Sequence, residues 1–503
     1  MAKDLPDELQ AACPSPHRRR SAPLRVLVYG MNHAPELVGV GRYTADIVIE
    51  LAGRGHAVSV VTTPPHYPHW DVSPWRAQGF RNRYTRETRD GVTIWRCPLV
   101  LRRPMRGASR LLAPLGFAVA SAPLVIWRIV RDRPDLVVCV EPTLLAAPAA
   151  LATARLAGAA LALHVHDLEP ETATGAGWAG RYARACAARL ARLRQHFDQV
   201  ITLSPAMARE ITRNCVPADR IHVQPNWVDV RRIARGHDPA RAAAWRQEAG
   251  VGEGQRIVLC AGSINRKHAP LLLVEAARRL SHRDDMVFVI AGDGPLRPDL
   301  QMAAAGLANV RFLPLQPEEV LPALMQLADV HVMPLDPAWD ELALPSRLGG
   351  MLASGKPVVV TGSADTELAQ FSGAAAVLCP PHDAAALAEA IVQALAPDCP
   401  TAARRAKHAR WRKALQLDRH RCLKGIVDML EDVATRAPSP GATTARGAPV
   451  NAPGRPERRP PAHGGPRPSA MLSGPGQNPA GSNDVITRCD ACIVTDRRGV
   501  LRP

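Results

Sequence analysis

Aromatic side chains are scarce in this chain of 503 residues, where phenylalanine, tryptophan and tyrosine together account for only 4%. Proteins that bind single-stranded nucleic acid stack its bases on such rings, and the chain shows neither zinc-finger spacing nor an aromatic RNA-binding motif. We therefore expect no nucleic-acid partner. The formal net charge of +17, supplied mostly by arginine, instead fits an anionic membrane surface together with a phosphorylated substrate.

Signal and cysteine patterns are also missing. Residues 1–22 are polar, without the apolar core of a secretory signal, so we expect residues 1–23 to be a disordered extension. The 11 cysteines show no disulfide framework, which favours a cytoplasmic location. Cys489 and Cys492 form the only close pair, with no second pair or histidines beside them, so no metal site is expected.

Long apolar runs are absent as well, and the nearest approach is an uncharged run at residues 111–127. It is too short for a spanning helix, which needs about 20 apolar residues. Arginines flank it on both sides, and two interpretations stay open: a segment lying in the membrane interface, or a buried core helix. The arginine-rich residues 181–194 predict a basic amphipathic helix that lies on a membrane or faces solvent.

The chain does contain a strand, a glycine loop, a helix and a second strand in succession. Apolar runs predict strands at 24–29 and 57–62, with helical periodicity from Thr44 to Leu51 between them. This order begins a doubly wound α/β domain, whose ligands bind at the carboxyl ends of strands. Gly39 and Gly41 have no β-carbon, so we expect the backbone there to approach a ligand and to direct helix N–H groups at an anion.

Further strands follow in two tandem groups. Ionisable residues come directly after the strand predicted at 160–164, where this architecture places chemistry; a solvated acidic loop is the alternative. A second sheet is predicted downstream, and a cleft between two such sheets is a common ligand site. Its strands are predicted at 256–262, 286–291, 310–313, 330–333, 358–360 and 376–378. A helical stretch at 402–434 ends the globular part, and the Pro/Gly/Arg-rich tail from 437 is expected to be disordered.

Six motifs in register link the chain to a family. They are residues 30–44, residues 225–229, Gly262 with Lys267, residues 292–295, residues 344–347 and residues 355–358. With them the chain resembles, over about residues 24–430, the GT-B glycosyltransferases of the large retaining family four. Residues 33–36, 41–44 and 63–68 are similar to the branch that builds colanic acid and related exopolysaccharides.

The resemblance implies an α/β, GT-B fold with two Rossmann-like domains facing a central cleft. The implied divisions are an N-terminal acceptor domain at 24–228, a nucleotide-sugar domain at 229–400, a helical segment at 401–436 and a tail at 437–503. The donor is a nucleotide-diphosphate sugar, and neither a cofactor nor a metal is implied, because lysine and arginine neutralise the diphosphate.

Site residues are carried over position by position. The implied catalytic residues are Asp167, His166, Lys267 and Glu341. The implied donor-binding residues are Gly39, Gly41, Gly262, Asn265, Arg266, Lys267, Gly292, Leu344, Pro345, Ser346 and Arg347. On the acceptor side stand His33, Arg42, Tyr43 and Glu169. Two positions depart from the family pattern. Gly349 stands where the family has the second glutamate of a pair, and Ser263 stands where it has the arginine of the phosphate turn.

Three functions fit this reading. The first is a retaining transfer of a hexose to a lipid-linked oligosaccharide, made by a protein held at the cytoplasmic membrane face through anionic lipid. In that mechanism the leaving diphosphate accepts the proton of the acceptor while Lys267 stabilises the developing charge. The second is a nucleotide-sugar epimerase of the same architecture. The third is a non-catalytic nucleotide-sugar-binding or scaffold protein, which the missing acid at Gly349 would favour.

Overall fold

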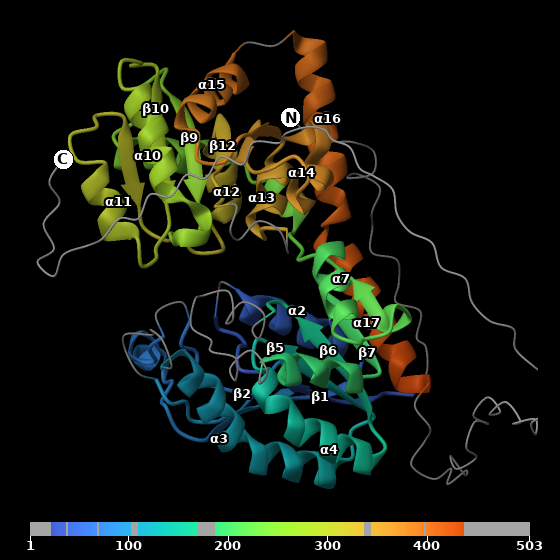
Figure 1. Cartoon of the computed structure of the whole chain (residues 1–503). Coiled ribbons are helices and arrows are strands. Elements are labelled where there is room, and N and C mark those ends of the chain that lie inside the picture. The colour runs from blue at the N-terminus through green and yellow to red at the C-terminus, as the bar shows by residue number, and fades with distance from the viewer. Residues whose placement is uncertain are drawn as a thin grey trace, which may run out of the picture. The chain divides into compact units, whose positions relative to one another are not determined.

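The computed structural model describes residues 22–36, 39–67, 70–101, 109–168, 187–336, 344–396 and 399–436, which contain two largely parallel sheets (Figure 1). The first sheet has eight strands in the order β3-β4-β2-β1-β5-β6-β7-β8, and only the β3–β4 pair is antiparallel. Its strands are β1 (Arg25–Tyr29), β2 (Ala57–Thr62), β3 (Thr85–Arg89), β4 (Val92–Arg96), β5 (Leu136–Glu141), β6 (Ala160–Val165), β7 (Gln199–Thr202) and β8 (Ile221–Val223).

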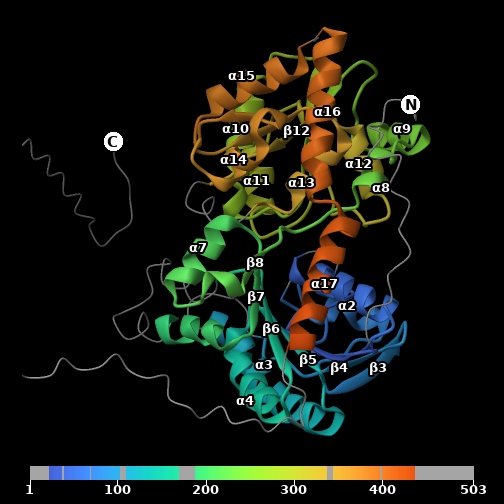
Figure 2. The same cartoon turned by 90° about the vertical axis from the view of Figure 1, so that its right-hand side faces the viewer.

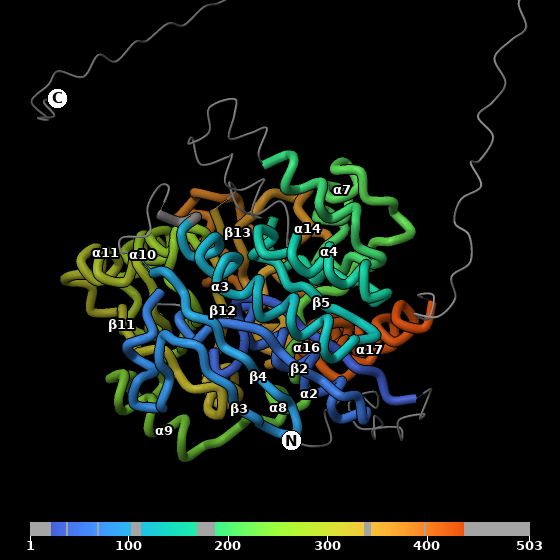
Figure 3. The backbone as a smooth tube through the Cα atoms, turned by 90° about the horizontal axis from the view of Figure 1, so that it is seen from below, coloured from blue at the N-terminus to red at the C-terminus, as the bar shows by residue number. Residues whose placement is uncertain are grey.

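Helices cover both faces of this sheet, which explains why its central strands are apolar on both sides. The helical elements are α2 (Val40–Gly53), η2 (Ser73–Gln78), α3 (Ser109–Asp132), η3 (Leu144–Ala146), α4 (Ala147–Ala157), η4 (Arg192–His196), α7 (Pro205–Arg213) and η5 (Ala218–Arg220). Helices α3 and α4 pack side by side on one face (Figure 3), and α2 packs on the other.

The second sheet has six parallel strands in the order β11-β10-β9-β12-β13-β14. They are β9 (Arg256–Ala261), β10 (Met286–Ala291), β11 (Val310–Leu313), β12 (Val330–Met333), β13 (Val358–Thr361) and β14 (Val377–Cys379). The helical elements around it are α8 (Val230–Ala234), α9 (Pro239–Glu248), η6 (Arg266–His268), α10 (Pro270–Arg279), α11 (Arg297–Ala303), α12 (Leu321–Leu327), α13 (Arg347–Ser354), α14 (Glu367–Ser372), η8 (Gly373–Ala375) and α15 (Ala384–Leu395).

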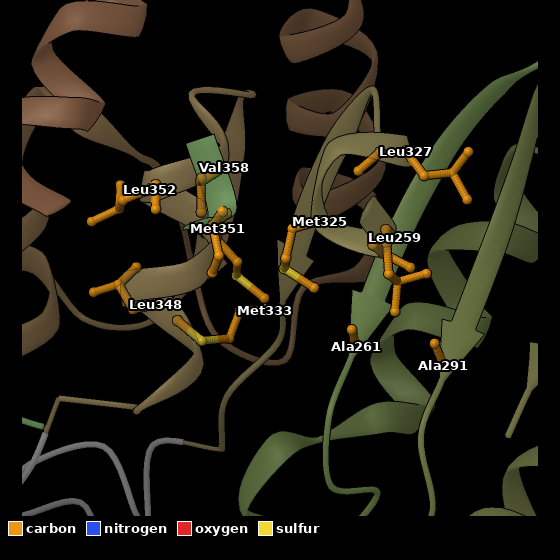
Figure 4. Close-up of a cluster of buried hydrophobic side chains, with 14 of the residues drawn as sticks. Leu259, Ala261, Ala291, Met325, Leu327, Met333, Leu348, Met351, Leu352 and Val358 are labelled. Atoms are coloured by element: carbon orange, nitrogen blue, oxygen red, sulfur yellow. The ribbon is translucent and has the colours of Figure 1, made fainter. Parts of the chain in front are cut away.

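Helix α13 is held by the core of this second sheet. Leu348, Met351 and Leu352 are fully buried and belong to one apolar cluster with Met333 of β12 and Val358 of β13 (Figure 4). Because this apolar side fixes the helix, its first residue, Arg347, is carried to the carboxyl end of the neighbouring strand β9.

The chain crosses between the two sheets twice, and the two crossings are hydrogen-bonded to each other. Val228 donates its N–H to the carbonyl of Leu417 at 2.9 Å, and Arg419 donates to the carbonyl of Val228 at 2.9 Å. The helical stretch predicted at 402–434 forms two helices, α16 (Pro400–Gln416) and α17 (Arg419–Arg436), which follow one another down the front of the view in Figure 2. Helix α16 packs against α13, whereas α17 joins the apolar cluster of α2 and the first sheet.

The structure bears on two interpretations of the sequence. The 111–127 run is part of the 24-residue helix α3, one side of which is buried core. Arg194, assigned to a basic helix on a membrane or in solvent, is instead fully buried and paired with Glu141 at 2.6 Å. The expected disordered segments, 1–23 apart from its last two residues and 437–503, lie outside the described residues.

Candidate functional site

The loop after β1 is fixed by a buried carboxylate. Glu36 accepts hydrogen bonds from the side chain of Asn32 at 2.9 Å, and from the backbone N–H groups of His66 at 2.9 Å and Tyr67 at 3.0 Å. Three donors satisfy a charge that would otherwise be costly to bury. Glu36 thereby joins the loops that follow β1 and β2, and places His33 and Tyr67 at the same edge of the sheet.

Gly39 and Gly41 are required by packing within the protein. Gly39 has a positive φ of 75°, and a β-carbon there would lie 3.3 Å from the ring of Tyr67. A β-carbon on Gly41 would lie 2.8 Å from a carboxylate oxygen of Glu36 and 3.2 Å from the backbone nitrogen of His33. The space beside these glycines, which we expected a ligand to approach, is thus occupied by other residues of the protein itself.

Two buried histidines and an aspartate end β6. The rings of His164 and His166 lie 4.0 Å apart, and Tyr43 of α2 stacks on His166 at 5.8 Å. Burial lowers the pKa of His164 to about 3 and holds the pKa of His166 well below its ordinary value, with His164 adding to the decrease. Both rings are therefore neutral at physiological pH. Within the described part of the chain, Nε2 of His166 has no hydrogen-bond partner.

Asp167 brings the two sheets into electrostatic contact. Part of the surface of Asp167 is exposed to solvent. The surrounding protein nevertheless dehydrates the carboxylate and raises its pKa, while the positive charge of Lys267 acts to lower that pKa. Burial likewise raises the pKa of Tyr67, and the negative charge of Asp167 adds to that increase. A tyrosine from the first sheet, the aspartate and a lysine from the second sheet therefore share one site.

Glycine turns at the ends of β9 and β10 allow their backbones to run against each other. Gly262 donates its N–H to Ala291 at 2.9 Å, and Ile264 donates to Asp293 at 2.9 Å. A β-carbon on Gly292, whose φ is +154°, would overlap the carbonyl oxygen of Gly262. Only glycine fits there, and the turn that carries Lys267 is held close to the end of β10.

Arg347 supplies a cationic group at this turn that is only partly paired among the described residues. Its Nη1 donates to the carbonyl of Ala261 at 3.2 Å, and a β-carbon on Gly262 would lie 3.4 Å from that nitrogen. Its Nε and Nη2 atoms are buried and have no partner among the described residues. Dehydration lowers the pKa of Arg347 while Cys260 opposes the decrease. A half-buried guanidinium with two vacant donors is suited to an oxyanion, which it can bind through two parallel hydrogen bonds.

Further polar groups lie around the turn that carries Lys267. Asp336 donates its N–H to the carbonyl of Lys267 at 3.1 Å, which fixes the turn against the end of β12. Oδ1 of Asn265 and Nδ1 of His268 are buried without partners in the described part of the chain. Dehydration together with Arg347 and Lys267 lowers the pKa of His268 to about 2, so this ring is neutral. Arg266 is exposed.

The other predicted positions divide into those near the site and those engaged elsewhere. Ser346 hydrogen-bonds Tyr43, whereas Pro345 accepts the N–H of Leu348 and Leu344 packs against the second core. Arg42 forms an ion pair with Glu318 at 3.1 Å. The guanidinium of Arg42 therefore has a partner within the protein, whereas the resemblance implies that it contacts the acceptor.

We call the part of the protein built on the first sheet the first lobe, and the part built on the second sheet the second lobe. His33 lies inside the first lobe, where burial and the charge of Arg96 lower its pKa to about 4. Glu341 and Glu169 lie outside the described residues. Among the residues that are described, no group of three histidine, cysteine or acidic side chains is placed to hold a metal ion.

The departure at Gly349 has a packing explanation. A β-carbon there would lie 2.9 Å from a methyl carbon of Val228 and 3.4 Å from Leu417, the two residues of the chain crossing. Any larger side chain would be directed into this crossing, so a glutamate does not fit. The missing acid consequently does not by itself indicate lost catalysis.

Sequence reasoning missed three residues that the structure brings to the site. Tyr67 and Glu36 were noticed only as parts of short motifs, and nothing in a motif shows that a carboxylate will be buried beneath two loops. His268 was overlooked because it follows Lys267 without any spacing signal. Its position, one residue from a cation in a tight turn, was the available hint.

Comparison with known proteins agrees with this architecture. A glycosyl transferase 4-like domain matches residues 38–227, and a glycosyl transferases group 1 domain matches residues 255–397. A protein of Escherichia coli (strain K12) named as the colanic acid biosynthesis glycosyl transferase WcaI is 37% identical over 389 residues, which cover 74% of this chain and 92% of that protein. A D-inositol 3-phosphate glycosyltransferase of Nocardia farcinica is 33% identical over 34% of this chain and 39% of its own length.

Solved structures support the fold alone. HepE of Anabaena, in complex with UDP-glucose, has a TM-score of 0.57 and 16% identity, covering 81% of this chain and 99% of that one. Sucrose-phosphate synthase from Thermosynechococcus elongatus has a TM-score of 0.60 and 16% identity, covering 82% and 99%. In both comparisons the matched region includes residues of both sheets.

Proposed function

Because the chain belongs to the GT-B glycosyltransferases of family four, we propose that it transfers a hexose from a nucleotide-diphosphate sugar to a lipid-linked oligosaccharide. The named relative in colanic acid biosynthesis supports a role in building an exopolysaccharide. The proposal includes a retaining mechanism, needs no cofactor, and places the protein at the cytoplasmic face of the cell membrane.

One observation carries the donor assignment. Nε and Nη2 of Arg347 are buried without partners in the described part of the chain, beside the glycine turns of β9 and β10 and close to Lys267. Two cations, one of them with two vacant donors, lie beside the carboxylate of Asp167 and match the charge and shape of a diphosphate. The exposed Arg266 is left out of this pocket.

The pocket favours the departure of the diphosphate. As the bond between the anomeric carbon and the phosphate oxygen breaks, negative charge accumulates on that oxygen, and preorganised donors there stabilise the transition state more than the bound substrate. Lys267 and Arg347 supply those donors. Asp167, whose charge faces Lys267, stabilises the positive charge that develops on the sugar.

The acceptor attacks from the side on which the diphosphate leaves. The new bond forms between the acceptor oxygen and the anomeric carbon, and the acceptor proton passes to the departing phosphate oxygen. This route needs no strong base. It is supported by the lowered pKa of His166, which makes this ring a weak base. Nε2 of His166, without a partner among the described residues, would orient the acceptor hydroxyl.

The proposal is tested by turnover of UDP-, GDP- and dTDP-sugars with the purified protein and a membrane lipid extract. We expect one donor to be consumed only when extract is present, and Lys267→Ala to lower the rate by about 10²–10³-fold. Arg279→Met, an exposed cation at the end of α10, is the matched control and should leave the rate unchanged. Consumption of no donor would refute glycosyl transfer, and a product of inverted anomeric configuration by NMR would refute retention.

A further inference from the structure

Helix α3 has two apolar sides, and only one of them belongs to the core. Phe117, Val125 and Ile129 are fully buried against the first sheet and α4. On the opposite side Leu115, Val119, Ile126, Trp127 and Val130 are exposed, Val119 by 69% and Val130 by 62%. Their spacing of three, four and seven residues aligns them in one stripe along the helix. Isolated exposed apolar residues are ordinary, but five of them aligned along one side of a helix mark an interaction site.

Neighbouring elements extend this stripe. Tyr84, 59% exposed, donates its hydroxyl to the carbonyl of Ala120 at 2.8 Å and so lies along the helix. Val100, 54% exposed, packs where Gly116 lacks a β-carbon, at 3.0 Å from the position that such an atom would take. We call the seven residues together the α3 face: Tyr84, Val100, Leu115, Val119, Ile126, Trp127 and Val130.

Arginines stand at the border of the α3 face. Arg128 and Arg131 lie over the ring of Trp127 at 5.4 and 5.3 Å, and Arg86 lies over Trp95, which contacts Trp127 edge to face at 5.9 Å. Such pairs hold guanidinium groups at the rim of an apolar surface. The nearby Arg81 and Arg83 are exposed as well. Tryptophan and tyrosine beside arginine, at the edge of an apolar stripe, form the composition found where proteins meet lipid headgroups.

A spanning helix does not fit the same observations. By length and composition alone, the segment Leu112–Asp132 is long and apolar enough to cross a membrane. However, its inner side is packed into the core of the first lobe, together with α4 (Figure 3). Lipid therefore has access to one side only, and the helix can lie along a bilayer without crossing it.

We propose that the α3 face docks on an anionic bilayer, with its apolar stripe in the headgroup boundary and the exposed Arg86 and Arg131 on lipid phosphates. The proposal deepens the proposed function, since it names the surface that would bring the enzyme to a lipid-linked acceptor. A second copy of the chain and a partner protein are the competing occupants. The arginine border favours lipid, because opposite charge on a bilayer complements it without a matching acidic surface on another protein.

Sedimentation with vesicles tests the docking directly. The full chain should bind vesicles of phosphatidylglycerol and phosphatidylethanolamine at 0.1 M salt and bind phosphatidylcholine vesicles at least tenfold more weakly. Val119→Asp with Val130→Asp should lower binding to the anionic vesicles at least tenfold. The control is Met302→Asp on α11, which alters an apolar residue of similar exposure on the other lobe and should leave binding unchanged.

Two further measurements separate the alternatives. Arg86→Gln with Arg131→Gln should remove the preference for anionic lipid and its salt dependence. The stabilisation of the Val119/Val130 variant by its nucleotide sugar should equal that of the wild type, so a loss of docking is distinct from a loss of the donor site. Equal binding by this variant and the wild type would overturn the proposal. So would a dimer, seen by analytical ultracentrifugation, that the two aspartates dissociate.

Discussion

Replacing Arg347 with methionine should strengthen the ligand-free fold and weaken donor binding at the same time. In the free protein the guanidinium is half-buried, with Nε and Nη2 unpaired among the described residues and its pKa lowered by dehydration. An unsatisfied buried polar group costs about 1–3 kcal/mol, and the bond to the carbonyl of Ala261 returns only about 1 kcal/mol. We therefore expect Arg347→Met to raise the free energy of unfolding by roughly 1 kcal/mol.

The effect on the donor has the opposite sign. Hydrogen bonds from a charged group contribute about 1.5–3 kcal/mol each, so losing two such bonds to a diphosphate should weaken binding by about 3 kcal/mol or more, which is roughly 150-fold at least. A donor at 100 times its dissociation constant stabilises the wild type by about 2.7 kcal/mol. At the same concentration the variant should gain at most about 0.3 kcal/mol.

Urea unfolding with and without donor measures both quantities in one experiment. Arg279→Met removes an exposed cation of the same lobe and should change neither of them. A less stable ligand-free Arg347→Met variant would show that the arginine is a structural cation. An unchanged donor effect would show that the diphosphate binds elsewhere, and either result refutes the reasoning.

Three further predictions concern the folded state. Gly292→Ala should destabilise the second lobe by more than about 4 kcal/mol in urea unfolding, because its β-carbon would overlap a backbone oxygen, whereas Gly53→Ala, which meets nothing within 4 Å, should be neutral. The pKa of His164 is lowered to about 3 from 6.5, so the unfolded state takes up a proton first and stability is lost as pH falls through 6.5; His164→Asn should lose roughly 2 kcal/mol less than the wild type between pH 7 and pH 5. Arg194→Met should cost about 3–5 kcal/mol in the same assay by leaving Glu141 buried without this partner, and adding Glu141→Gln should recover part of that loss.

Periodicity was sufficient for the regular elements, because both sheets are buried on two faces. The strands predicted at 57–62, 286–291, 310–313 and 330–333 have these bounds in the structure. Strand β3, with the sequence Thr-Arg-Glu-Thr-Arg, was not predicted. It is an edge strand with little buried surface, so neither continuous nor alternating apolar residues mark it.

Contacts between residues that are far apart in the chain could not be predicted from the sequence. The pairing of Val228 with Leu417 joins residues far apart in the chain, and it explains both the return of α17 to the first sheet and the glycine at 349. Likewise, a buried partner for Arg194 cannot be read from an arginine-rich pattern, since solvated and buried arginines look alike in it. Of the predicted donor residues, Gly262, Asn265, Lys267, Gly292 and Arg347 lie at the turns after β9 and β10. Gly39 and Gly41 pack instead against Tyr67 and Glu36, Leu344 and Pro345 serve packing and the start of α13, and Arg266 is exposed.

The most direct test of the account is an equilibrium titration of the wild type and of Lys267→Ala with UDP-, GDP- and dTDP-sugars, read by thermal shift. We predict that one of these nucleotide sugars stabilises the wild type by a few kcal/mol at saturation, and that the lysine variant loses most of this gain. Stabilisation by none of them, or an equal gain in both proteins, would contradict the claim that the turn after β9 grips a diphosphate.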